Sequence, residues 1–356
     1  MKFTPHPPTP SPLEGKGSKT PSLLFFPLFS FFFFLTSSFA TDSEILAGHE
    51  GWLDRMGAGV VELGRGNTGT AFLEATPAAY WNPALLPFQR KPQVAMGAEI
   101  RSLDRNGSYL SFQERLTGNL GVGLGILNRG DFNVPAYDGN ENYIGTARPQ
   151  AFASYLGVGL RTSRNNAFGA TVLWYAGNLD LGGGYGDLNF VGGLNLGWYH
   201  RFPDSISAAV VIRNLGINEH LSAEFEQTVF SDQTQSGFQS TQTDFFPKTI
   251  IVAGEWRKSL FHFPWIFAGE VLDYQLKNQI FASNPASHTQ AVRVGVDCEL
   301  ATRTHLRTGV DRGDITFGLG YTFLWNRRPI QFDYALLLER GWMTFNPYAI
   351  GLKTVF

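Results

Sequence analysis

From Pro92 to the C-terminal Phe356, apolar positions alternate with polar or glycine positions in short segments that are separated by turn residues. The clearest segment spans 118–129, where Leu120, Val122 and Leu124 alternate with asparagine and glycine. Similar alternation recurs at 94–100, 190–198, 292–300, 315–323 and 330–338. Alternation with period two is typical of a β-strand with one apolar face, and a long series of such strands predicts an antiparallel transmembrane β-barrel.

Strand number and loop length support this fold class. Allowing about 9 to 13 residues for each strand, we count about fourteen. They start near 92, 107, 118, 149, 166, 188, 205, 247, 263, 289, 303, 313, 329 and 346. Short connections, such as 161–165 and 301–302, follow even-numbered strands, and long ones, such as 130–148 and 216–246, follow odd-numbered strands. Barrels of the outer membrane have short periplasmic turns and long extracellular loops. A soluble all-β fold stays open as an alternative, because alternation alone does not distinguish a core face from a lipid face.

The chain ends on an alternating strand that closes with Phe356, and Tyr348, Ile350 and Leu352 share its face. This strand resembles the C-terminal assembly signal of bacterial outer-membrane proteins. The resemblance implies that the barrel-assembly machinery and outer-membrane lipid are partners of this chain.

Residues 1–40 have the pattern of a targeting segment. Lys16 and Lys19 precede an apolar run at 23–35, and small residues lead to Ala40. This order predicts a signal peptide that is cleaved after Ala40. A membrane anchor is the alternative, although the run has only about 13 residues and contains Pro27, whereas a spanning helix needs about 20.

Composition excludes further classes. The 356 residues include 40 Gly and 31 Phe, and the formal net charge is −2. A near-neutral chain without a long basic run is not expected to bind nucleic acid. Cys298 is the only cysteine, so no intramolecular disulfide can form. Its position on the outward face with Val296 and Leu300 predicts a small apolar residue that faces lipid.

The inward face carries glycine in the N-terminal half of the barrel and charge in the C-terminal half. Gly121, Gly123, Gly125, Gly157 and Gly159 would permit close approach of another backbone. The inward charges are Arg293, Asp297, Glu299, Arg307, Asp311, Asp333, Glu339 and Lys353. Their mixed signs predict paired charges in the lumen, either as a structural ion-pair network or as a polar conduit.

Residues 41–91 lack strand alternation and contain a glycine-rich stretch followed by an Asn-Pro motif. The motif residues are Gly64, Gly66, Asn67, Gly69, Trp81, Asn82, Pro83 and Ala84. This region resembles the N-terminus of the FadL-like outer-membrane proteins, and most closely that of their PorV/PorQ branch. The C-terminal third of the chain also resembles that branch, at 290–295, 307–310, 318–320 and 332–335. The resemblance implies that 41–91 form a hatch that plugs the periplasmic side of the lumen of a barrel formed by 92–356. Asn82 is suited to cap a helix that starts at Pro83.

We find no pattern that predicts an enzyme, a cofactor or a metal site. The histidines are scattered without metal-ligand spacing, and His200 lies beside Trp198 and Tyr199 at the expected membrane interface. The glycine run at 121–125 lies within a strand with no following helix, so it is not a dinucleotide loop. A lipid hydrolase assembled from a serine, a histidine and an acid stays open.

Two non-enzymatic functions follow from the resemblance. PorV-like proteins serve type IX secretion, which implies that extracellular loops dock exported proteins for surface attachment. The candidate loop spans 222–246 and contains Phe225, Phe230, Phe238, Phe245 and Phe246, although its polar composition also fits a disordered loop. The alternative is FadL-like uptake of hydrophobic solutes such as long-chain fatty acids. Uptake needs an apolar lumen pocket with a polar anchor, and the charged inner face disfavours it.

Overall fold

The computed structural model describes residues 56–101, 105–131, 134–137, 143–180, 189–216, 221–227, 238–244, 247–275, 288–338 and 347–356. The predicted signal peptide, residues 41–55 of the predicted hatch, and Glu339, Phe230, Phe245 and Phe246 lie outside this part of the chain. Within it, no helix is both long enough and apolar enough to cross a membrane.

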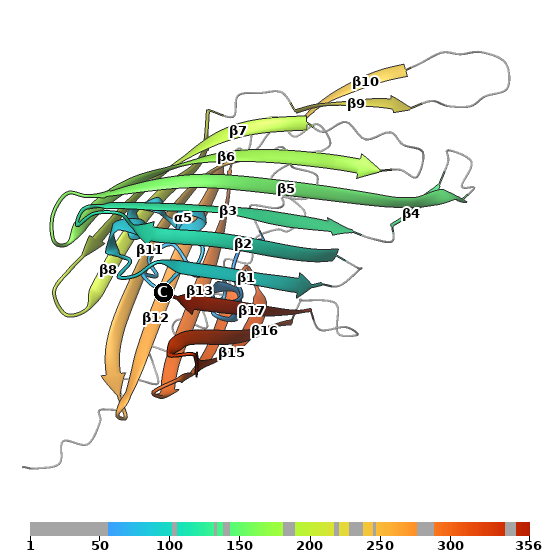
Figure 1. Ribbon diagram of the computed structural model, residues 1–356. Coiled ribbons are helices and arrows are strands. Elements are labelled where there is room, and N and C mark those ends of the chain that lie inside the picture. Colours follow the sequence, from blue (N-terminus) through green and yellow to red (C-terminus); the bar gives the residue numbers. More distant parts are fainter. Residues whose placement is uncertain are drawn as a thin grey trace, which may run out of the picture. The chain divides into compact units, whose positions relative to one another are not determined.

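Fourteen antiparallel strands form a closed ring (Figure 1). They are β1 (Gln93–Ile100), β2 (Arg105–Arg115), β3 (Leu120–Asp131), β5 (Tyr143–Arg161), β6 (Asn166–Asp180), β7 (Asn189–Arg201), β8 (Ile206–Leu215), β11 (Lys248–Leu260), β12 (Phe263–Gln275), β13 (His288–Ala301), β14 (Thr304–Asp311), β15 (Asp314–Trp325), β16 (Arg328–Leu338) and β17 (Tyr348–Val355). The first and last strands close the ring, with Gln93 opposite Val355 and Ile100 opposite Tyr348. The predicted barrel of about fourteen strands is confirmed.

The strand boundaries differ from the prediction mainly in the long connections. The structure starts β5 at Tyr143 rather than near 149, because 143–147 pair with the short strand β4 (Val134–Tyr137). Within the candidate docking loop, β9 (Leu221–Gln227) and β10 (Phe238–Asp244) pair as an antiparallel hairpin. Alternation did not predict these three strands, because they lie outside the ring and have no lipid face to impose an apolar stripe.

The outward face of the ring is apolar and exposed. Met96, Leu124, Leu319 and Leu352 are 40–50% exposed, as are many large apolar residues on the same face. An exposed apolar belt around a closed ring suits lipid, whereas a soluble barrel would bury these side chains. The alternation therefore marks a lipid face.

Cys298 corrects one prediction about this belt. It lies opposite Trp265 on β12 and Leu306 on β14, yet it is only 3% exposed. The larger side chains of its cross-strand neighbours flank the small thiol. Cys298 is therefore a buried residue of the barrel wall rather than a lipid-facing one.

Residues 56–91, which we call the N-terminal segment, pack against the inward faces of the strands. The segment contains α4 (Val60–Gly64), α5 (Ala78–Trp81) and the 3₁₀-helix η1 (Pro83–Phe88), most of whose residues are buried. Helix α4 contacts β14 to β17, and η1 contacts β2, β3, β5, β6 and β7. The segment therefore touches strands on both sides of the ring.

Inward glycines make this packing possible. A Cβ atom at Gly159 would lie 2.3 Å from the backbone oxygen of Pro83, and one at Gly309 would lie 2.4 Å from the amide nitrogen of Gly66. Real Cβ atoms do not approach other atoms so closely, so only glycine fits. Gly121, Gly123 and Gly157 meet η1 and α5 in the same way. The backbone that approaches these glycines is that of the N-terminal segment.

Candidate functional site in the barrel lumen

The Asn-Pro motif holds the N-terminal segment together through local hydrogen bonds. The side-chain oxygen of Asn82 accepts from the backbone amide of Ala84 at 3.0 Å, and Pro83 occupies the first position of η1. The side-chain amide of Asn82 donates to the carbonyl of Thr70 at 3.0 Å and to that of Trp198 on β7 at 3.2 Å. Asn82 thus caps a helix, closes a loop of the segment and attaches it to the wall.

The other motif residues allow tight turns and contacts. Trp81 is fully buried, and its indole nitrogen donates to the carbonyl of Ala58 at 2.7 Å. Gly69 leaves the room that the ring of Trp81 fills. Gly66 has φ +70°, and its amide donates to the hydroxyl of Thr316 on β15 at 2.9 Å. Gly64 lies directly against Gly318, so two backbones meet there without side chains.

Five of the predicted inward charges form buried ion pairs on β13 to β16. Arg293 binds Asp311 at 2.7 Å, and Arg307 binds Asp297 at 2.9 Å and Asp333 at 2.7 Å. Asp333 lies two strands away from Arg307, and Gly320 on the intervening β15 leaves space for the guanidinium group. Because these charges are buried and paired with one another, they form a structural ion-pair network, of which Asp297 and Arg307 also border a cavity at one end of the barrel.

The remaining two described charges of that set, Lys353 and Glu299, lie nearer the end of the ring where Gln93 and Val355 meet, which the short connections predict to be periplasmic. The ammonium group of Lys353 donates to the carbonyl of Glu74 in the N-terminal segment at 3.1 Å. Glu299 is half-buried at the wall of a periplasmic cavity.

A second set of charges, which the sequence did not reveal, fastens the N-terminal segment to the wall. Arg65 binds Glu255 on β11 at 3.4 Å and stacks its guanidinium over the ring of Phe72 at 3.9 Å. Arg257 binds both carboxylate oxygens of Glu74, at 2.7 and 2.5 Å. A signal existed in the sequence, because Glu255 and Arg257 fall two residues apart on the inward face of β11.

Two further contacts extend this attachment to β12 and β14. The backbone amide of Thr70 donates to Glu270 at 2.7 Å. The side-chain amide of Asn67 donates to Asp311 at 2.7 Å, so the predicted motif meets the predicted charge network. Residues 65–74 of the segment are thus held on β11–β14 by polar contacts, whereas 78–88 are held on β3–β7 by close packing.

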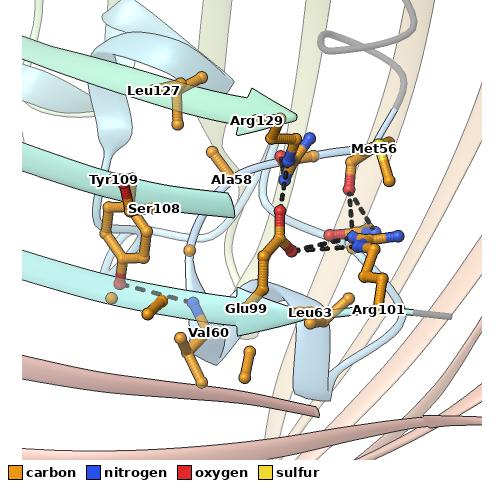
Figure 2. A pocket seen from close by; sticks show the side chains of 16 residues that line it. Met56, Ala58, Val60, Leu63, Glu99, Arg101, Ser108, Tyr109, Leu127 and Arg129 are labelled. Atoms are coloured by element: carbon orange, nitrogen blue, oxygen red, sulfur yellow. Dashed lines mark hydrogen bonds and ion pairs between the residues drawn. The ribbon is translucent and has the colours of Figure 1, made fainter. Parts of the chain in front are cut away.

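Glu99 and Arg129 lie near the ends of β1 and β3 that the long connections predict to be extracellular, and there a cluster of charges surrounds the start of the described segment (Figure 2). Glu99 pairs with Arg101 at 3.0 Å and also with Arg129, which donates to the carbonyl of Gly57 at 2.7 Å. The backbone amide of Val60 donates to the hydroxyl of Tyr109 at 3.5 Å. These residues line a cavity of about 20 Å³, which has room for about one water molecule.

Glu62, within α4, is the one fully buried carboxyl of the segment. Burial raises the pKa of Glu62 to about 7, even though the backbone amide of Thr76 donates to its carboxylate at 2.9 Å and Lys353 and Arg65 are near. Glu62 is therefore poised between its neutral and charged forms near neutral pH.

An apolar cluster lines the inward face of β8 and β11–β13. Its members are Val211, Ile251, Leu272, Tyr274 and Ala291, and none is more than 2% exposed. Their register places them on the extracellular side of Glu255, Glu270 and Arg293. The sequence did not predict this cluster, because Ile250, Ile251 and Val252 are all apolar and alternation is lost where both faces are apolar.

A larger cavity of about 690 Å³ lies at the periplasmic ends of β11–β17. Its wall includes Phe72, Glu74, Arg257, Trp265, Glu299 and His305. About half of the residues that line this cavity are charged, whereas the apolar cluster contains no charged residue. The N-terminal segment, which carries Arg65 and Thr70, lies between this cavity and the apolar cluster.

The predicted interface residues lie at the same end of the barrel. His200 stacks on Trp198 with ring centroids 6.0 Å apart, whereas Tyr199 points inward and is buried. Phe356 is outward and 48% exposed, with the guanidinium of Arg328 5.1 Å from the centre of its ring. Across the part of the chain that the structure describes, no three His, Cys, Asp or Glu side chains are grouped to hold a metal ion.

The closed ring and its apolar outer belt give the chain the architecture of a bacterial outer-membrane β-barrel. No protein-family model and no curated protein sequence matches the chain. Solved structures do match. The Pseudomonas putida toluene transporter TodX is 14% identical, with a TM-score of 0.59, and the match covers 85% of this chain and 99% of that one.

Two other matches agree with this fold. The Ralstonia pickettii toluene transporter TbuX is 13% identical, with a TM-score of 0.55 and coverage of 85% and 99%. A Pseudomonas aeruginosa FadL homologue is 10% identical, with a TM-score of 0.54 and coverage of 84% and 98%. At 10–14% identity these matches show the fold alone, which is that of the FadL-like proteins.

Proposed function

We propose that this chain is an outer-membrane channel for the uptake of hydrophobic small molecules. The observation that carries the proposal is the apolar cluster of Val211, Ile251, Leu272, Tyr274 and Ala291 on the extracellular side of the N-terminal segment. Its members are at most 2% exposed, so a small hydrophobic molecule would bind among them by displacing these apolar side chains, with the phenol of Tyr274 at the edge. Toluene transporters of the same fold support this class of solute.

The inward charges do not oppose this function. From the sequence they made an apolar pocket improbable, and secretion was the preferred interpretation. In the structure, Arg293, Asp311, Arg307 and Asp297 neutralise one another, and Glu255 and Glu270 bind the N-terminal segment. Paired, buried charges of this kind contribute to the framework of the lumen and leave the apolar cluster as a separate level.

In this proposal, the N-terminal segment is the hatch that separates the extracellular lumen from the periplasmic cavity. Two features support this role. Its backbone fits against inward glycines on both sides of the ring, and its polar contacts reach β11, β12 and β14. A solute that moved from the apolar cluster toward the periplasm would contact residues 65–74 of this segment first.

The test is solute binding by the purified protein, with toluene and oleate as probes. Leu272→Gln places an amide in the apolar cluster, and we expect it to weaken binding about tenfold or more, because burying an apolar side chain of this size contributes about 1.5–3 kcal/mol. The matched control is Val252→Gln, because Val252 is 54% exposed on the outward face of β11. Circular dichroism checks that both variants fold. Absence of binding by the wild-type protein, or equal weakening in both variants, contradicts the proposal.

A second candidate is the PorV-like role in protein export and surface attachment. It is supported by the sequence Trp81-Asn82-Pro83-Ala84, which resembles that branch, and by the hairpin β9–β10 within the candidate docking loop. Phe225 and Phe238 lie on this hairpin. Co-purification of the barrel with the C-terminal domain of a secreted protein, lost when 221–244 are deleted, would favour export over uptake.

A further inference from the structure

The periplasmic end of the barrel carries a rim of exposed basic residues. We define this basic rim as Arg90, Lys91, Arg164, Lys258, Arg303, Arg327 and Arg328. Each lies just before β1 or where the chain turns after β5, β11, β13 or β15, which are the fourth, eighth, tenth and twelfth strands of the ring. All these positions are at the end where Gln93 and Val355 meet. The exposed acidic residues at this end are Asp204 and Glu74, and Glu74 is bound to Arg257. The seven exposed cations thus outnumber the acidic residues at this end, which also include the half-buried Glu114 and Glu299.

Within the described part of the chain, the basic rim has no carboxylate partner. Among the residues that the structure describes, no carboxylate lies within ion-pair distance of any of its seven members, whereas Arg65, Arg129, Arg293 and Arg307 inside the barrel all bind carboxylates. Like charges without partners at one end of a molecule repel one another at low ionic strength. An external anion that neutralises them would offset this repulsion.

Aromatic residues place the basic rim at the membrane interface. Phe261 is 71% exposed and Trp325 is 69% exposed, and they lie three residues from Lys258 and two residues from Arg327. The stacking of Arg328 on Phe356 joins the two types of residue directly. Exposed aromatic residues at strand ends gather at the level of lipid headgroups. The basic rim therefore lies at the depth of the headgroups of the periplasmic leaflet.

The distribution of the cations around the ring indicates the type of partner. Arg164 follows β5, Lys258 ends β11, Arg303 follows β13, and Arg327 follows β15. A compact protein partner would meet a single patch, but these positions are spread over most of the circumference. An annulus of lipid meets all of them at once.

We propose that the basic rim binds anionic phospholipid headgroups of the periplasmic leaflet and so fixes the depth and annular lipid of the barrel. A phosphate group accepts charge-assisted hydrogen bonds from arginine, and membrane-surface lysine and arginine attract anionic lipid at short range. This binding is separate from the proposed transport site, because the apolar cluster faces the opposite side of the N-terminal segment.

The test uses wild-type protein in phosphatidylcholine vesicles that contain brominated phosphatidylglycerol. Quenching of tryptophan fluorescence gives the affinity for phosphatidylglycerol relative to phosphatidylcholine. We expect a preference of about fivefold at low salt, because surface cations attract anionic lipid. The preference should fall to about one at an ionic strength of about 1 M, where charges are screened within about 3 Å.

The variant R164Q/R303Q/R327Q should lose the preference, and K248Q, at the extracellular end, should keep it. The proposal is overturned if wild-type protein shows no salt-sensitive preference, or if the triple variant keeps it. If the triple variant does not fold, the salt titration of the wild-type protein decides alone. Binding of soluble polyglutamate without a preference for phosphatidylglycerol would instead assign the rim to an acidic polypeptide and reject the lipid.

Discussion

Gly295→Ala tests whether the N-terminal segment is packed against the barrel wall as described. A Cβ atom at Gly295 on β13 would lie 2.2 Å from the backbone oxygen of Arg65 and 2.3 Å from the hydroxyl of Thr68. An ordinary contact begins at 3.4 Å, so Arg65 would have to move by 3.4 − 2.2 = 1.2 Å. Because the obstructing atom is backbone, a rotamer change cannot relieve the clash. Overpacking of this type costs about 1–3 kcal/mol.

The matched control is Gly269→Ala on the neighbouring strand β12. Gly269 lies opposite Val294, the residue before Gly295, and a Cβ atom there would have no neighbour within 4 Å. Alanine is less flexible than glycine in the unfolded chain, so this control should be neutral or more stable by about 0.5 kcal/mol.

Two measurements read the outcome. In urea unfolding in detergent, Gly295→Ala should be less stable than Gly269→Ala by about 2 kcal/mol. In planar bilayers, Gly295→Ala should conduct ions more often than the control, because displacement of Arg65 breaks its contact with Glu255 and loosens the segment. If both variants match the wild type in stability and conductance, the described packing is wrong.

Three further predictions address individual groups. Glu62→Gln should remove a pH dependence of stability. The pKa of Glu62 is about 7 in the folded protein and 4.5 ordinarily, so folding disfavours its charged form, and wild-type stability should fall by about 3 kcal/mol as the pH rises from about 4.5 to above 7. Urea titrations at each pH measure this fall, which the variant should lack. Glu74→Gln should cost no more than about 1 kcal/mol, because its pair with Arg257 is partly exposed. A double-mutant cycle with Arg257→Gln in high and low salt measures this pair energy separately from the contact of Arg257 with the buried Glu255. Cys298 should react with a maleimide in native protein at least about tenfold more slowly than in urea, because it is 3% exposed; rapid native labelling would contradict its burial.

The ring of strands could be predicted from the sequence because lipid imposes a local rule. Thirteen of the fourteen predicted strand starts, all except the one near 149, lie within two residues of the observed ones. The inward glycines and the cap at Asn82 were also predictable, since each depends on residues close in sequence or on one face of one strand. The strands β4, β9 and β10 were missed because they do not contact lipid.

The partners of the inward charges could not be predicted in the same way. Arg65 and Glu255 are 190 residues apart in the chain, and only the closed ring brings them together. For the same reason the sequence suggested a charged lumen, although the structure separates paired charges from the apolar cluster around Ile251 and Leu272. This separation changed the preferred function from export to uptake of hydrophobic solutes.

The most direct test of the account is to locate a bound solute. Crystals of the wild-type protein soaked with bromotoluene would show the bromine atom by its anomalous scattering. We predict a bromine site against Ile251, Leu272 and Tyr274, on the extracellular side of Arg65 and Thr70. Bromine found solely on the outer belt or in the charged periplasmic cavity would contradict the proposed channel.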